Sequence, residues 1–228
     1  MMSEILIALT VLLGAAMAYR IDAGSKLFKY ILSFSGAFLL GILFTGLIPG
    51  LFHTHAHDAI NMGWWIIAGF LIQILLDFLS QGLEHGHHHH QQIKVTALIG
   101  LFLHAFLEGT PLHGHNHGNE PLLIGIILHK LPIAILVVSA LRNTTISSMA
   151  LYSSILIFAL ATPMGIMVAE QPWALPYLQP LTGIAAGLLL HVSTTILFET
   201  SQNHRFNAIK MAVVIVGIAA AAGVEQLM

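Results

Sequence analysis

The fold class is decided by residues 121–141, which read PLLIGIILHKLPIAILVVSAL. This run is almost wholly apolar, and its only ionisable residues are His129 and Lys130, near its centre. A helix that spans a membrane needs about 20 consecutive apolar residues. The run therefore predicts a transmembrane helix.

The rest of the chain shares this composition. Hydrophobic residues make up 57% of the 228 residues and charged residues only 8%, against roughly 25% charged residues in soluble domains. A soluble fold could not cover so much apolar surface, whereas a bilayer solvates it with hydrocarbon. The length fits one domain.

The composition also limits partners and ligands. There is no cysteine, so no disulfide can form and a metal site must use nitrogen and oxygen ligands. A net charge of -2 offers no basic surface to nucleic acid. Met1 to Glu4 lack the basic segment of a secretory signal, so we expect the first apolar run to be a retained helix.

Eight runs are apolar enough to be transmembrane helices. We expect an all-α, polytopic membrane protein of about eight transmembrane helices, with residues 1–228 as a single transmembrane domain and 81–92 as a histidine-rich cytoplasmic loop within it. The runs cover residues 4–19, 28–49, 62–80, 93–112, 121–141, 146–169, 173–199 and 207–227.

Basic residues gather in the odd-numbered connections between these runs. Because cytoplasmic loops carry the excess of Lys and Arg, the odd connections are predicted to be cytoplasmic and both termini to lie outside. We expect a multi-pass protein of a bacterial inner (plasma) membrane. The bases concerned are Arg20, Lys26, Lys29, Lys94, Arg142, Arg205 and Lys210.

Few ionisable residues lie inside the runs. A charge at the bilayer centre costs about 2.5–3.5 kcal/mol on insertion scales, so such residues face the bundle interior and are candidates for function. His104 and Glu108 are four residues apart, which places both on one face of a helix. An imidazole and a carboxylate are two ligands for a metal such as Zn²⁺. The alternative is a hydrogen-bonded pair that only joins two helices.

His129 is a candidate third ligand. Pro132 removes a backbone hydrogen bond, and protein groups or water in a cavity must satisfy the carbonyl that it frees one turn earlier. His129 is therefore expected to face a hydrated path, or else to be a core histidine beside a packing kink. Lys130 is interpreted as a fixed or switchable charge that pairs across the bundle, or as a side chain that extends toward the cytoplasm. Its candidate partners are Glu108, Asp77 and Glu199.

Histidine clusters occupy three of the connections, and such clusters bind Zn²⁺, Ni²⁺ and Cu²⁺ loosely. We expect them to collect metal at both mouths of a membrane path, which suits a transporter better than an enzyme. In the seventh run, His191 either joins the path or packs beside neighbouring threonines. The clustered histidines are His53, His55, His57, His85, His87, His88, His89, His90, His113, His115 and His117.

On these residues the chain resembles the ZIP family of metal transporters (Zrt-, Irt-like proteins), as a divergent member of bacterial type. The family's fourth-helix pattern, His-Asn-x-x-acid-Gly, corresponds to residues 104–109, and its fifth-helix pattern, His-Glu-x-Pro-His-Glu, keeps His129 and Pro132. Ala186-Gly187, with the run that ends at Glu199, is similar to a third family stretch. The resemblance implies both termini outside, an inverted repeat of helices one to three in helices six to eight, and a paired metal site between helices four and five.

The chain departs from the family at the second metal position. Ala105 replaces the bridging asparagine, Lys130 replaces an acid, and residues 133–134 replace the closing His-Glu. By this resemblance one site is expected to survive, with the ammonium group of Lys130 in place of the second metal. The surviving ligands would be His104, Glu108 and His129.

We therefore expect a transporter and not an enzyme. It would move a divalent metal into the cytoplasm without a cofactor, and Zn²⁺ is the metal that we expect before others. Its partners would be metal ions and the lipid bilayer, and the sequence leaves open whether it forms a homodimer. Two alternatives remain, a divergent metal-binding membrane protein without transport and a haem-binding electron carrier with histidine axial ligands. An intramembrane metalloprotease would need His-Glu-x-x-His, which the chain lacks.

Overall fold

The computed structural model describes residues 2–53, 59–80, 95–113, 120–199 and 208–227. Within these residues the chain is helical and contains no β-strand. Six helices are long and apolar enough to cross a membrane, and two further apolar helices are shorter. The prediction of an all-α polytopic fold is confirmed.

The helices follow the eight predicted runs, with ends shifted by a few residues. One run contains a π-helical turn, which joins α2 to α3, and two runs include short 3-10 helices. The elements are α1 (Met2–Met17), α2 (Lys26–Ile42), η1 (Leu43–Leu47), α3 (Ile48–His53), α4 (Ala59–Ser80), α5 (Val95–Leu107), η3 (Thr110–Leu112), α6 (Glu120–Arg142), α7 (Ser148–Ala169), η4 (Pro172–Tyr177), α8 (Leu178–Glu199) and α9 (Ala208–Leu227).

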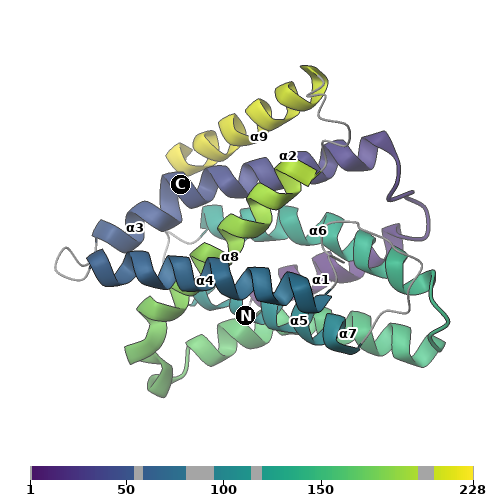
Figure 1. Ribbon diagram of the computed structural model, residues 1–228, viewed down its shortest axis with the longest axis horizontal. Coiled ribbons are helices and arrows are strands. Elements are labelled where there is room, and N and C mark those ends of the chain that lie inside the picture. Colours follow the sequence, from purple (N-terminus) through teal and green to yellow (C-terminus); the bar gives the residue numbers. More distant parts are fainter. Residues whose placement is uncertain (1, 54–58, 81–94, 114–119, 200–207, 228) are drawn as a thin grey trace.

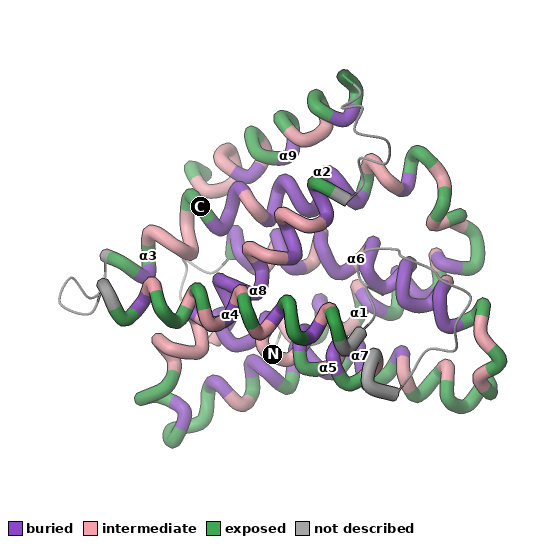
Figure 2. Tube along the Cα trace, in the orientation of Figure 1, coloured by how far each residue is buried: buried purple, intermediate pink, exposed green. Residues whose placement is uncertain are grey.

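Helix α6 lies at the centre of the bundle (Figure 1). In its membrane-length stretch 67% of the residues are buried, against 17% in α9. Figure 2 shows the exposed residues along the outer faces of α4, α7 and α9. Large apolar side chains such as Leu71, Leu156 and Ile215 are among them. Such a surface suits lipid and not water, so the chain is a multi-pass integral membrane protein.

Glycines bring α4 and α8 into close contact. A Cβ atom at Gly69 would collide with the Ile184 carbonyl, and one at Gly187 would collide with the Ile66 carbonyl. Small residues at helix contacts are typical of membrane bundles, where close backbone packing drives association. This contact matters for the site, because α4 and α8 carry the polar residues described below.

Arg142, from the fifth connection, contacts residues just before the first connection at one end of the bundle. Nη1 of Arg142 donates a hydrogen bond of 3.0 Å to the Ala18 carbonyl, and its guanidinium lies 3.9 Å from the centroid of the Tyr19 ring. The ends of α1 and α6 and the starts of α2 and α7 all lie on the right in Figure 1. Trp64 and Trp173, 66% and 64% exposed, lie near the starts of α4 and η4, as expected for an aromatic belt. Which end faces the cytoplasm stays a prediction.

Substitution of Gly187 tests the α4–α8 contact. Gly187→Ala should lower the free energy of unfolding by about 1–3 kcal/mol, because the added methyl group forces the two backbones apart. Gly63→Ala, in the same helix pair but with no atom within 4 Å of its added Cβ, should be neutral or slightly stabilising. Thermal unfolding in detergent measures both. Equal melting temperatures for the two variants would contradict the proposed close contact.

Candidate metal site

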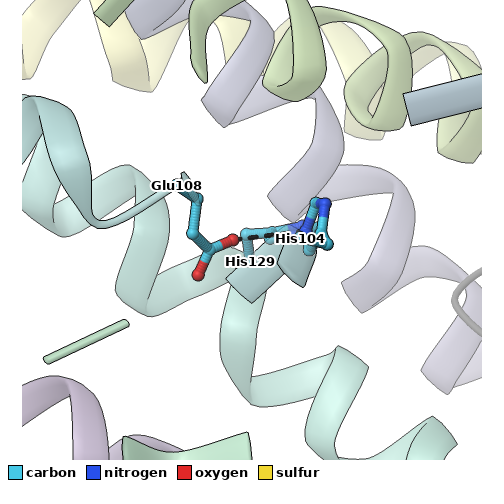
Figure 3. Close-up of side chains that lie close together, drawn as sticks. All are labelled: His104, Glu108 and His129. Atoms are coloured by element: carbon cyan, nitrogen blue, oxygen red, sulfur yellow. Dashed lines mark ion pairs between the residues drawn. The ribbon is translucent and has the colours of Figure 1, made fainter. Parts of the chain in front are cut away.

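The three predicted ligands lie together inside the bundle. His104 projects from α5, Glu108 from the turn that follows it, and His129 from α6, and all three are buried. Each offers one ligand atom, and these atoms all lie within 4.8 Å of one another. Figure 3 shows the Glu108 carboxylate pointing toward the two imidazole rings. The sequence-based grouping of these residues matches the geometry, while metal binding itself stays a prediction.

Helix α5 ends in a way that keeps His104 and Glu108 on one face. The Glu108 N–H donates to the His104 carbonyl at 3.1 Å, so the i, i+4 geometry continues into the turn. A Cβ at Gly109 would collide with the Thr162 carbonyl, and one at Gly165 with the Phe106 carbonyl. These two glycines therefore allow α7 to lie directly against the end of α5.

The close approach of α7 places a hydroxyl group at the carboxylate. Oγ1 of Thr162 lies 2.9 Å from Oε1 of Glu108 and 2.7 Å from the Ala105 carbonyl oxygen. A hydroxyl carries one proton, so the two acceptors share it. Thr162 has no sequence signal of its own, since nothing in a single sequence indicates that residues 105 and 162 meet.

Lys130 forms an ion pair with Glu108. Its Nζ lies 2.5 Å from Oε1 of Glu108, and the two side chains are 2% and 0% exposed. The Phe158 ring from α7 lies 4.5 Å from the same ammonium group and adds a cation–π contact. The structure therefore selects Glu108 from the three candidate acids and excludes a lysine that extends toward the cytoplasm.

The two carboxylate oxygens of Glu108 have different surroundings. Oε1 contacts both Lys130 and Thr162. Oε2 lies 3.3 Å from Nε2 of His104, is buried, and receives no hydrogen bond from the described residues. His129 approaches from the neighbouring helix, with its ring centroid 6.2 Å from that of His104. One oxygen and two imidazoles thus converge, an arrangement that can bind a divalent cation.

A polar chain leads from His104 toward α8. Nδ1 of His104 lies 2.9 Å from Oε1 of Gln73, whose Nε2 donates to Oδ1 of Asp77 at 2.7 Å. Oδ2 of Asp77 lies 2.8 Å from Nε2 of His191. Hydrogen bonds thus connect the cluster to Asp77, which the sequence offered as a candidate partner of Lys130, and to His191, which it offered as a candidate for the path. Gln73 was missed, although its spacing of four from Asp77 places both on one helical face.

The structure describes only some of the other predicted site residues. His113 is half-buried, and its Nδ1 lies 2.9 Å from the Thr110 carbonyl oxygen. His53 and Glu199 occupy the ends of α3 and α8. The remaining histidines of the predicted metal-collecting loops lie outside the described residues: His55, His57, His85, His87, His88, His89, His90, His115 and His117.

Fold and site together define a multi-pass membrane protein that buries a cluster of metal-ligand type. A family model for the ZIP Zinc transporter matches residues 81–225, which is more than half of the chain. The chain belongs to this family.

Individual relatives agree with the family match. The chain is 26% identical over 163 residues to Zinc transporter ZIP9 of Micropogonias undulatus. This match covers 62% of the chain and 53% of that relative. It is also 26% identical over 171 residues to Zinc transporter ZIP9-B of Xenopus laevis, and this match covers 66% of the chain and 56% of that relative. The chain thus spans about half the length of the curated relatives that it matches.

Removing the counter-charge of Glu108 tests the ion pair. Lys130→Met should cost about 3–5 kcal/mol of stability, because it leaves a buried carboxylate without its cation. Added Zn²⁺ should restore part of this loss, because the metal supplies positive charge to the same carboxylate. Thermal unfolding with and without ZnCl₂ measures both effects. Lys26→Met, at the exposed start of α2, is the control, and an equal loss in both variants would contradict the assignment.

Proposed function

We propose that the chain transports a divalent metal, Zn²⁺ first, into the cytoplasm through a site formed by His104, Glu108 and His129. One observation carries the proposal: the three side chains are buried together in a chain of a zinc transporter family, with ligand atoms within 4.8 Å of one another. We place the chain in a bacterial inner (plasma) membrane, from which it would deliver the metal to the cytoplasm.

The donor set suits a borderline cation. Two neutral imidazoles and one carboxylate oxygen are ligands that Zn²⁺ accepts, and three protein ligands leave a fourth position open for water or for the next ligand along a path. A transported ion must also leave its site, which an incomplete coordination shell permits. The chain has no cysteine, so thiolates, which hold Zn²⁺ most firmly, take no part.

Lys130 limits the proposed site to one metal ion. Its ammonium group and the Thr162 hydroxyl both contact Oε1 of Glu108, so this oxygen cannot also bridge to a second cation. The lysine thereby stands in for the second metal of the paired site that the family resemblance implies. Asp77 and His191, half-buried and hydrogen-bonded to each other, are proposed to line the path beside this single site.

Metal uptake into proteoliposomes tests the function. Zn²⁺ uptake should be lost in His104→Ala and in Glu108→Gln, because each substitution removes one of the three proposed ligands. Glu170→Gln, at the exposed end of α7, is the matched control and should transport like the wild type. The double variant Glu108→Gln/Lys130→Met, which removes both buried charges, separates loss of the ligand from misfolding. Wild-type uptake in the ligand variants would refute the proposal.

Two other functions give different results in the same preparation. A metal-binding protein without transport would bind Zn²⁺ in calorimetry, lose this binding in His104→Ala, and show no flux. A haem-binding electron carrier would show a Soret absorption band after purification, which a metal transporter would not.

Protons should compete with the metal. The proposed ligands bind as neutral imidazoles, and histidine in solution has a pKa of about 6.5. Zinc affinity should therefore change little above about pH 7 and should fall as the pH drops through about 6.5 toward about 6 and below, by up to about tenfold per unit for each histidine that must release a proton. Calorimetric titrations between about pH 5 and 8 measure this. An affinity that rises on acidification would contradict histidine ligation.

A further inference from the structure

Gln73 connects the proposed metal site to a carboxylate on the same helix. Its side chain is fully buried, and it reaches His104 on α5 with one end and Asp77 with the other. A carboxylate only accepts hydrogen bonds, so the amide Nε2 must face Asp77. This contact fixes the orientation of the amide, which leaves Oε1 facing the imidazole of His104.

The orientation of the amide in turn fixes the tautomer of His104. A carbonyl oxygen cannot donate, so Nδ1 of His104, 2.9 Å from Oε1 of Gln73, must carry a proton. In the neutral imidazole the other nitrogen, Nε2, then bears a lone pair. Nε2 is the nitrogen that lies 3.3 Å from Oε2 of Glu108 and faces the cluster.

We propose that Gln73 is a positioning residue of the metal site, which holds His104 as the Nδ1–H tautomer so that its Nε2 is ready to bind the cation. Asp77 acts one step further out, because it orients the amide. The inference rests on the proposed metal site. It differs from a role in helix packing alone, which would not depend on which nitrogen carries the proton.

The chain offers a substitution pair that separates these roles. Gln73→Leu removes the acceptor at Nδ1 while keeping similar volume. The double variant Gln73→Glu/Asp77→Asn exchanges the amide and the carboxylate without changing the net charge. In it, the carboxylate introduced at position 73 would still accept from Nδ1 of His104, and the amide introduced at position 77 could donate to that carboxylate and still accept from His191.

The test uses the full-length chain in lipid bilayers, with Zn²⁺ alone as the ligand. Nitrogen NMR of labelled histidines reports the tautomer, and His104→Ala identifies the signal. The wild type and the exchanged double variant should show the Nδ1–H form, and Gln73→Leu should lose it. Zinc affinity should fall about 10–100-fold in Gln73→Leu, as for other residues that orient a metal ligand, and stay within a few-fold of wild type in the double variant.

The outcomes distinguish this inference from the proposed function. Gln171→Leu, at an exposed position just after α7, controls for the loss of a glutamine and should change neither readout. A retained tautomer and affinity in Gln73→Leu would overturn the inference, provided that His104→Ala still loses zinc. Unchanged zinc affinity in His104→Ala would instead refute the metal site itself. Where Gln73→Leu does not fold, loss of the tautomer in the double variant overturns the inference.

Discussion

The buried ion pair between Glu108 and Lys130 is the constraint on which the centre of the structure depends. Opposite charges inside an apolar bundle are tolerated only in close contact and with further polar groups around them. Helix α7 supplies two such contacts, the Thr162 hydroxyl at the carboxylate and the Phe158 ring at the ammonium group. These contacts require α5 and α7 to approach closely, which explains the glycine at position 109.

The same ion pair gives the two carboxylate oxygens of Glu108 different roles. Because Lys130 and Thr162 occupy Oε1, only Oε2 faces the two imidazoles. The pair is also neutral as a unit, so a divalent ion that enters brings a charge that the site does not fully offset. The site therefore holds a divalent ion less tightly than a site with a net negative charge would. For a proposed transport site this is an advantage, since the ion has to leave again.

The sequence predicted the helices well because a membrane helix depends on a local feature, a single apolar run of sufficient length. It also predicted His104, Glu108 and His129 as a group, because ionisable residues in such runs are rare. It could not choose the partner of Lys130, since pairing depends on helix packing that spacing does not encode. The sequence did not single out Thr162 and Gln73, because burying an uncharged polar residue in a membrane helix costs less free energy than burying a charge. Such residues are therefore not recognised as part of a site until the structure shows what they contact.

The direction of the hydrogen bonds explains why the cluster lies where it does. At one end of the polar chain a lysine ammonium can only donate, and Glu108 accepts from it. On the other side of His104 the Asp77 carboxylate can only accept, which sets the direction of the two bonds that lead through Gln73 back to the imidazole of His104. Two acceptors, Nε2 of His104 and Oε2 of Glu108, are therefore left face to face in the proposed tautomer, 3.3 Å apart and beside His129. Incomplete polar networks are costly in a low-dielectric interior. A proton or a metal cation at this junction completes the network, and the two compete for it.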